Sequence, residues 1–218
     1  MPPSKPKPTN PLPSRERVLA AAERLLGSGS AEFSMRELAA EAGVSFATPF
    51  NQFGSKTAIM QALSEKRIAL MHERLTVAAA ASGNAATRTL MAAEIAAQVM
   101  LETPSVNRAV MAVLGAPTQA AGDVLIRSRA LWTAALGDGD GLQASRVDLA
   151  FLVLPDKLAF AFRGVLSFWT AGEIADDALV PQARAAAAAL LMGFAAKDTR
   201  TQLEAVMRAP ANQIITSM

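Results

Sequence analysis

Signals for helix starts and helix ends follow one another closely in one segment of this chain, which limits the segment to short helices joined by tight turns. Ser34 can cap a helix whose third residue, Glu37, reaches back to the cap. Phe33, just before the cap, can pack against Leu38. Gly43 permits the left-handed backbone that closes a helix, so we expect this one to end at about that glycine.

A second short helix follows the turn, and longer helices flank the pair. Ser45 is the predicted cap of the second helix, which runs to about Phe53. Ser55 caps a long helix over residues 56–80. Ahead of the pair, apolar residues recur at helical spacing over residues 14–27, behind a serine that we expect to cap the helix.

The rest of the chain is rich in alanine and lacks sustained runs of Val, Ile and Thr, so helices are expected there too. The expected helices span residues 87–102, 104–114, 117–136, 145–173 and 181–196, with prolines 104, 117 and 181 in first turns. Pro155 predicts a kink or a break near Leu154. The glycine-rich segment 137–141 predicts a flexible loop. The predicted fold class is therefore all-α.

Composition excludes several classes of chemistry. The chain has no cysteine, which excludes disulfides, thiolate nucleophiles and cysteine-ligated metal centres and fits a reducing compartment. Residues 1–13 are proline-rich and basic without the apolar stretch of a secretory signal, so we expect a disordered basic arm. The alanine-leucine run at 185–196 is about half as long as a bilayer crossing requires. We expect a soluble, cytoplasmic protein with no membrane partner.

Charge is distributed only slightly unevenly. Residues 1–75 carry ten Lys and Arg against seven Glu, and residues 76–218 carry eleven against twelve Asp and Glu. A basic surface for nucleic acid and ordinary scatter are both compatible with this difference.

Two short helices joined by a tight turn and flanked by further helices have the dimensions of a helix-turn-helix. The second helix of such a unit can lie in the major groove of DNA with its amino-terminal residues toward the base edges. Its exposed candidates are Phe46, Thr48, Asn51 and Gln52. Asn51 and Gln52 can pair with adenine edges, while phosphate contact and simple solvation stay open as alternatives.

Three stretches occur in order within residues 14–63: RxxVLxAAxxLL, SMRELAAEAGVS and TPFNQFGSK. Together they resemble the DNA-binding domain of the TetR family of transcriptional regulators. The resemblance implies a homodimer that binds double-stranded DNA at a palindromic site and responds to a small-molecule effector. From the resemblance and the helix geometry together, the predicted DNA-binding residues are Met35, Arg36, Ser45, Phe46, Thr48, Phe50, Asn51, Gln52 and Lys56.

Two of these residues have a separate physical argument. Lys56 stands at a helix amino terminus, where a cation and backbone N–H groups converge on a phosphate. The alternative is a solvated surface lysine. Arg36 could bind a guanine or a phosphate, or it could pair with a nearby glutamate.

The sequence departs from the family pattern at two positions. Phe50 stands where the family usually has tyrosine, so a hydroxyl that would bond a phosphate is missing, a loss of about 1 kcal/mol. Pro49 replaces a usual leucine or isoleucine and cannot donate a backbone hydrogen bond. Because Pro49 also disfavours helical geometry at Thr48, we predict that the second helix starts late or with a tight irregular turn. The alternative is that its first turn absorbs the proline without functional cost.

The resemblance divides the chain into a helix-turn-helix domain of three helices at 14–63 and a larger ligand-binding and dimerisation domain at 64–218. It implies that the last two long helices pair with their copies in a four-helix bundle and that the middle helices enclose a ligand pocket. The segment 158–169 is apolar nearly all round, which fits burial on more than one side. Alanines 185–189 offer a flat face for close helix approach.

The predicted pocket residues are large and apolar, although each is as compatible with a plain core position: Met100, Met111, Leu125, Trp132, Phe151 and Phe162. Methionine-rich walls adapt to varied shapes, which favours an apolar or aromatic effector. Arg127 and Arg129 could meet an anionic group or be solvated.

An enzyme is the first alternative function. His72 is the only histidine, and no serine or acid is placed in sequence to form a relay with it, so we expect no catalysis. Asp138 and Asp140 lie in a loop too short for a calcium site, so no metal and no cofactor are expected. A second alternative is a helical ligand-binding or protein-interaction module that has lost specific DNA binding, which Pro49 and Phe50 favour.

Overall fold

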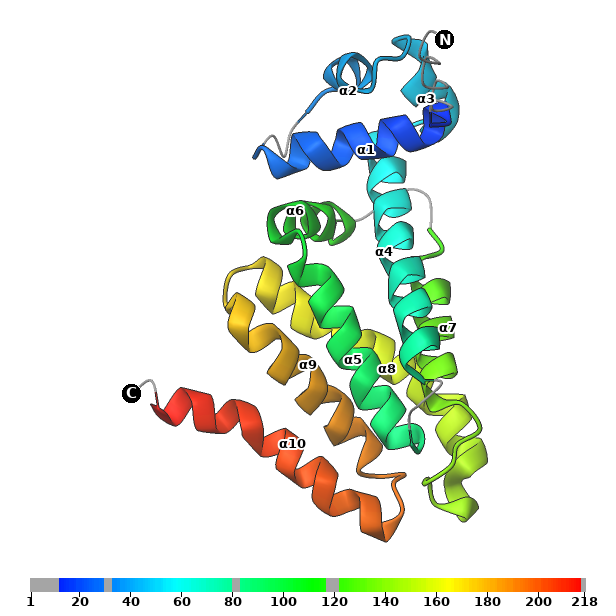
Figure 1. Cartoon of the computed structure of the whole chain (residues 1–218), viewed down its shortest axis with the longest axis vertical. Coiled ribbons are helices and arrows are strands. Elements are labelled where there is room, and N and C mark those ends of the chain that lie inside the picture. Colours follow the sequence, from blue (N-terminus) through cyan, green and yellow to red (C-terminus); the bar gives the residue numbers. More distant parts are fainter. Residues whose placement is uncertain (1–11, 30–32, 80–82, 117–121, 217–218) are drawn as a thin grey trace, which may run out of the picture. The chain divides into compact units, whose positions relative to one another are not determined.

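A computed structural model describes residues 12–29, 33–79, 83–116 and 122–216, and within them the chain is helical without a β-strand (Figure 1). The helices are α1 (Ser14–Gly27), α2 (Met35–Ala42), α3 (Ala47–Phe53), α4 (Lys56–Ala79), α5 (Ala85–Leu101), α6 (Pro104–Leu114), α7 (Val124–Leu136), η1 (Ala144–Arg146, a 3₁₀ turn), α8 (Val147–Thr170), α9 (Asp176–Leu191) and α10 (Lys197–Thr216). The predicted all-α fold is confirmed. The arm predicted at residues 1–13, apart from its last two residues, and Pro117 lie outside the described residues.

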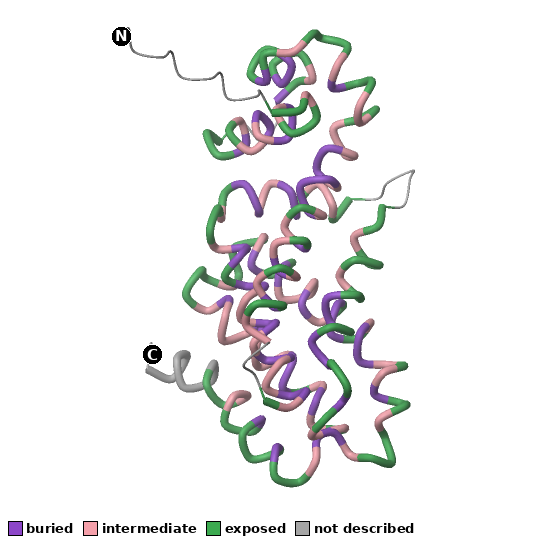
Figure 2. Tube along the Cα trace, turned by 45° about the vertical axis from the view of Figure 1, so that its right-hand side comes forward, coloured by how far each residue is buried: buried purple, intermediate pink, exposed green. Residues whose placement is uncertain are grey.

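The chain forms two compact units, residues 1–59 and 60–218, and the division falls within α4. In the amino-terminal unit, α1 packs against α2 and α3, and α2 packs against α3. Buried positions, purple in Figure 2, recur at intervals along the helices of both units. The buried apolar residues of the amino-terminal unit are Val18, Leu19, Ala21, Ala22, Leu26, Phe33, Leu38, Ala39, Ala42 and Ile59.

Helix α2 begins and ends as its sequence predicts. The Glu37 N–H donates to the Ser34 hydroxyl at 3.2 Å, and the Ser34 N–H donates to the Glu37 carboxylate at 2.7 Å. These two bonds satisfy amide groups that have no partner within the helix. Gly43 follows at φ +62, the left-handed conformation that closes the helix.

Two predicted serine caps are wrong. Pro13 precedes the first residue of α1 and no side chain caps this helix, while the Ser14 hydroxyl accepts a hydrogen bond from Gln52 at 2.5 Å. Helix α3 begins at Ala47 after Phe46, so Ser45 lies outside the helix. In both cases the serine hydroxyl bonds another side chain, a competing arrangement that short polar side chains readily adopt.

In the carboxy-terminal unit, α9 lies between α5 and α10, and α8 packs against α7 and α9 (Figure 1). Trp132, Trp169 and leucines of these helices are almost fully buried. Each such side chain contributes about 1.5–3 kcal/mol by leaving water. The Trp169 ring N–H donates to Asp176 at 2.7 Å, which ties the end of α8 to the start of α9.

The last part of the chain differs from the prediction. Helix α9 spans Asp176–Leu191, not residues 181–196, and Pro181 lies inside it. Two aspartates in its first turn suit the positive end of the helix dipole and mark the true start. Helix α10, packed on α9 and burying Leu203, was not predicted.

In helix α8 the break, one of the two predicted effects of Pro155, does not occur. The helix begins at Val147 and ends at Thr170, inside the predicted residues 145–173, and it continues through Pro155 without a break. A proline inside a helix costs about 3 kcal/mol. Leu154 and Leu158, each 1% exposed, bury enough apolar surface on either side of the proline to offset that cost.

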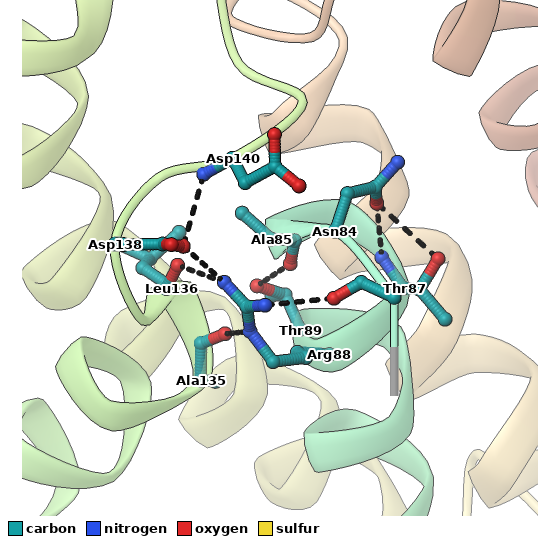
Figure 3. A network of polar contacts seen from close by, with 10 residues as sticks. Asn84, Ala85, Thr87, Arg88, Thr89, Ala135, Leu136, Asp138 and Asp140 are labelled. Atoms are coloured by element: carbon teal, nitrogen blue, oxygen red, sulfur yellow. Dashed lines mark hydrogen bonds and ion pairs between the residues drawn. The ribbon is translucent and has the colours of Figure 1, made fainter. Parts of the chain in front are cut away.

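The glycine-rich segment 137–141 is a hydrogen-bonded loop, not the flexible loop that was predicted. Figure 3 shows how it is held against the start of α5. The Arg88 guanidinium donates to the carbonyl of Leu136 at 2.9 Å and to the carboxylate of Asp138 at 3.0 Å, and the Ala85 N–H donates to the Asp140 carbonyl at 2.8 Å. Gly141 has φ +80, and a side chain there would meet Asn84 at 2.7 Å, so this position requires glycine.

The same loop contacts the turn between α9 and α10. The Gln143 N–H donates to the Phe194 carbonyl at 2.8 Å, and the Ala196 N–H donates to the Gly141 carbonyl at 3.0 Å. Leu142 and Ala195 form an isolated antiparallel bridge. The loop therefore joins the start of α5 to the α9–α10 turn.

Asp138 gives this loop a pH-dependent contribution to stability. Hydrogen bonds from the Asp140 N–H and from Arg88 hold the pKa of the Asp138 carboxyl below its usual value. A lowered pKa in the folded state stabilises the protein above the unfolded value of about 4, and the contribution is lost as the pH falls through the folded value. We expect Asp138→Asn to lower the thermal midpoint at pH 7 and the difference from wild type to shrink below about pH 4. Glu204→Gln, an exposed carboxylate on α10, is the control, and a difference that persists unchanged at low pH would contradict the assignment.

Candidate nucleic-acid interface and ligand cavity

The turn between α2 and α3 is held by an arginine of α1. The Arg17 guanidinium donates to the Ala42 carbonyl at 3.1 and 3.0 Å and also to the Gly43 carbonyl. Arg24 lies about two turns further along α1, and its guanidinium donates to the Glu41 carboxylate at 2.5 Å. Cations suit the carbonyl end of a helix, so α1 fixes the point at which the chain leaves α2.

Pro49 shapes the start of α3. In a regular helix its N–H would bond the Ser45 carbonyl, but proline has no N–H. The Thr48 N–H takes that carbonyl instead, at 2.9 Å, and the Ser45 and Thr48 hydroxyls lie 2.8 Å apart. The predicted late start with a tight first turn is confirmed.

The predicted DNA-binding residues of α3 are mostly on its exposed side. Phe46 and Phe50 are 58% and 43% exposed, and their rings pack edge to face with centroids 5.6 Å apart. Asn51 is exposed and Thr48 is half-buried. Gln52 differs, because it is half-buried and its amide donates to Ser14 of α1.

The remaining predicted contacts lie at two helix starts. Arg36 is exposed in the first turn of α2 and forms no ion pair with the described residues, while Met35 is half-buried. Lys56 begins α4, and its ammonium lies 4.5 Å from the centre of the buried Phe33 ring. Ser55 caps α4 as predicted, since its hydroxyl accepts from the Ala58 N–H at 3.1 Å.

Hydrogen bonds from Ser34 and the nearby Lys56 charge lower the pKa of the Glu37 carboxyl, which keeps it ionised beside this lysine.

This arrangement is that of a helix-turn-helix, and the sequence matches a known family there. Residues 18–63 match the family model of bacterial regulatory proteins, tetR family. The chain carries a TetR-family amino-terminal domain. A comparison with curated proteins finds no significant match.

Solved structures share the fold of this chain over most of its length. A TetR transcriptional regulator from Rhodococcus sp. RHA1 is 22% identical with a TM-score of 0.63, over 82% of this chain and 96% of the other. A protein with unknown function from the same organism is 25% identical with a TM-score of 0.56, over 88% and 100%. A gamma-butyrolactone receptor (ArpA like protein) is 17% identical with a TM-score of 0.54, over 92% and 97%. The helices that follow the TetR-family domain thus have the architecture of TetR-like regulators.

The carboxy-terminal unit contains a narrow cavity of about 60 Å³. Helices α4, α5, α6, α7 and α8 all contribute to its wall. Three of the predicted pocket residues, Met100, Met111 and Phe162, line it. The walls are mainly apolar, and methionine side chains can rearrange around a guest.

The other three predicted pocket residues lie elsewhere. Leu125 lines an adjoining groove of about 330 Å³. Trp132 is buried behind Phe162, with ring centres 5.8 Å apart, and its ring N–H has no hydrogen-bond partner among the described residues. Phe151 packs beside Gly139 in the loop after α7.

The polar lining of the cavity was not predicted. It includes Ser64, Arg67, Asn107, Ser128 and Arg163. Arg67 donates to the buried Asn107 side chain at 3.1 Å, and Asn107 donates in turn to the Met100 carbonyl at 2.8 Å. Arg163 could have been found, because it is the single charge within the apolar segment 158–169. Arg127 and Arg129 instead form ion pairs outside the cavity, with Glu65 at 3.5 Å and Asp156 at 3.4 Å.

Two kinds of feature are absent from the part of the chain that the structure describes. No helix there combines the length and the apolar character needed to cross a membrane. Among the same residues, no histidine and carboxylate side chains cluster in a way that could hold a metal ion.

Arg17 and Arg24 allow a test of what holds the turn of the TetR-family domain. Arg17→Met removes two partly buried hydrogen bonds to the Ala42 carbonyl and an exposed one to the Gly43 carbonyl, and we expect it to lower the free energy of unfolding of this domain by about 2 kcal/mol. Arg24→Met removes a pair with Glu41 whose side chains are 57% and 38% exposed and one exposed hydrogen bond to the Glu41 carbonyl, so we expect a loss below about 1 kcal/mol. Urea unfolding with hydrogen exchange over residues 43–53 measures both variants. Equal losses would contradict the special role of Arg17.

Proposed function

We propose that this protein is a ligand-responsive DNA-binding transcriptional regulator, acting as a repressor, that binds a palindromic operator as a homodimer in the cytoplasm. The observation that supports the proposal most directly is the set of side chains exposed at α3. The exposed side of α3 presents Phe50 and Asn51, with Phe46 directly before its first residue, and the helix packs against α1 and α2. Exposed aromatic rings are costly in water unless they have a partner.

The residue types of α3 suit the edges of base pairs. Asn51 can donate to and accept from adenine, and Phe46 offers an apolar contact for a thymine methyl group. Arg36 and Lys56, at the starts of α2 and α4, supply cations for phosphates, which position the helix without reading sequence. Gln52 contributes to packing with α1 in addition to any contact with DNA.

Helix α4 is the element through which an effector would act. It begins with Lys56 and continues to Ser64, Arg67 and Met71, which line the cavity. A guest that spreads the cavity walls would displace this part of α4 relative to α6 and α8. Because DNA binding by a dimer requires a fixed spacing of two recognition helices, about one helical turn of DNA apart, such a displacement lowers affinity.

The DNA contacts predict a dependence on salt. Arg36→Met and Lys56→Met should each weaken binding and reduce the slope of log affinity against log salt by about one. Arg129→Met, which removes an exposed arginine of α7 paired with Asp156, is the control and should leave the slope unchanged. Gel-shift titrations at several salt concentrations, on a fragment selected from genomic DNA, measure both quantities. A response that is flat in salt would count against DNA as the partner.

Pro49 and Phe50 favour a second candidate, a helical ligand-binding or protein-interaction module without specific DNA binding. Pro49 alters the first turn of α3, which spans only seven residues, and Phe50 lacks the hydroxyl that the family pattern supplies. Failure of a genomic selection to recover any bound fragment, with a folded protein, would favour this candidate.

A second copy of the chain is the proposed partner of α8. Four large apolar side chains on this helix are half or more exposed: Leu149, Leu152, Phe160 and Phe168. Neighbouring α9 presents Ala189 as exposed and Ala185 and Ala186 as half-buried, small residues that permit close approach of another helix. A monomer would leave this apolar face in water.

Leu152→Arg tests the dimer. Leu152 is 69% exposed, so the arginine is tolerated in a monomer, but it would bury an unpaired charge between two copies. We expect a shift from dimer to monomer at micromolar concentration in light scattering after size exclusion. Val77→Arg on α4 starts from a valine that is 76% exposed and is the matched control. A wild-type monomer, or an L152R dimer as tight as wild type, would contradict the proposed interface.

A further inference from the structure

Arg163 is placed where a bound molecule would meet it. It lies in the middle of α8 and is half-buried. Its side chain lines the narrow cavity and also two adjoining hollows, the groove that includes Leu125 and a wider one that includes Gly164 and Ser167. It therefore stands at the junction of an apolar interior and open surface.

The guanidinium of Arg163 lacks a strong acceptor among the described residues. Within the described part of the chain it donates one hydrogen bond, to the Met111 sulfur at 3.3 Å, and a thioether is a weak acceptor. Several other arginines of this unit pair with carboxylates, as Arg108 does with Asp176 at 2.6 Å and Arg184 with Glu94 at 2.6 Å. Burial without such a partner lowers the pKa of the Arg163 guanidinium.

The described residues that line the hollows around Arg163 include no opposite charge. Neither the cavity nor the two hollows has an aspartate or a glutamate in its lining, whereas Arg67 adds a second cation to the cavity. Asn107 holds Arg67 at the wall. Because a partly desolvated cation is costly without a partner, the site as it stands favours the arrival of a negative charge.

We propose that the effector is an apolar carboxylate, whose hydrocarbon part enters the cavity beside Met100, Met111 and Phe162 and whose carboxylate pairs with Arg163. This inference rests on the proposed effector role of the cavity and narrows the ligand from an apolar or aromatic molecule to an apolar acid. The planar fork of arginine matches a carboxylate with two parallel hydrogen bonds. Since the cavity is narrow, the hydrocarbon part displaces methionine side chains as it enters.

Matched pairs of probes test the charge separately from the apolar part. Decanoate is compared with decanol, and 4-phenylbutyrate with 4-phenylbutanol, by isothermal titration calorimetry on the full chain. We expect at least one acid to bind roughly ten-fold more tightly than its alcohol. Arg163→Met should abolish this preference, Arg163→Lys should keep part of it, and Arg129→Met should leave it unchanged.

Each outcome bears on the inference. Equal binding of acid and alcohol, an unchanged preference in R163M, or no binding of either acid at millimolar concentration would overturn it. Arg163→Met removes an uncompensated charge, so the variant is expected to fold, and circular dichroism checks this. Gel shifts of the unliganded wild type and R163M separate the two proposals. If the protein binds DNA but shows no preference for the acids, only the inference about the effector is rejected. If it prefers the acids but does not bind DNA, only the proposed role as a transcriptional regulator is rejected.

Discussion

The guanidinium of Arg17, held against the carbonyls of Ala42 and Gly43, is the contact on which the amino-terminal unit depends. A glycine in the left-handed conformation can leave a helix in several directions, and hydrogen bonds from a neighbouring helix select one of them. With that direction fixed, α3 packs on α1 and α2 and keeps its aromatic side chains exposed. The proposed recognition of DNA therefore depends on how α1 and α2 hold α3, as well as on the residues of α3.

Local signals in the sequence predicted this unit well, because its helices are short and begin and end at residues with strong conformational preferences. Ser34 with Glu37, and Gly43, act through their immediate neighbours and can be recognised without knowledge of the fold. Ser14 and Ser45 were misjudged. The Ser14 hydroxyl accepts from Gln52 on another helix, a partner that no local pattern reveals. The Ser45 hydroxyl bonds Thr48, three residues along the chain, in place of a helix N–H.

The carboxy-terminal unit shows where such prediction ends. The start of α9 depends on contacts of Asp176 with Trp169 and Arg108, and α8 passes through Pro155 because leucines on both sides are buried. Apolar type and size suggested Met100, Met111 and Phe162, which line the cavity, but Trp132 and Phe151 have the same character and lie elsewhere. Arg67 and Arg163 reach the wall through the arrangement of several helices, which periodicity does not encode.

The loop after α7 has a practical meaning for protein engineering. Three glycines and two aspartates suggest a permissive site for a tag, a reporter insertion or a circular permutation. Its backbone is instead bonded to the start of α5 on one side and to the α9–α10 turn on the other. Additional residues there would break the hydrogen bonds that join the loop to the start of α5 and to the α9–α10 turn. Exposed polar composition is therefore a poor guide to insertion tolerance in this molecule.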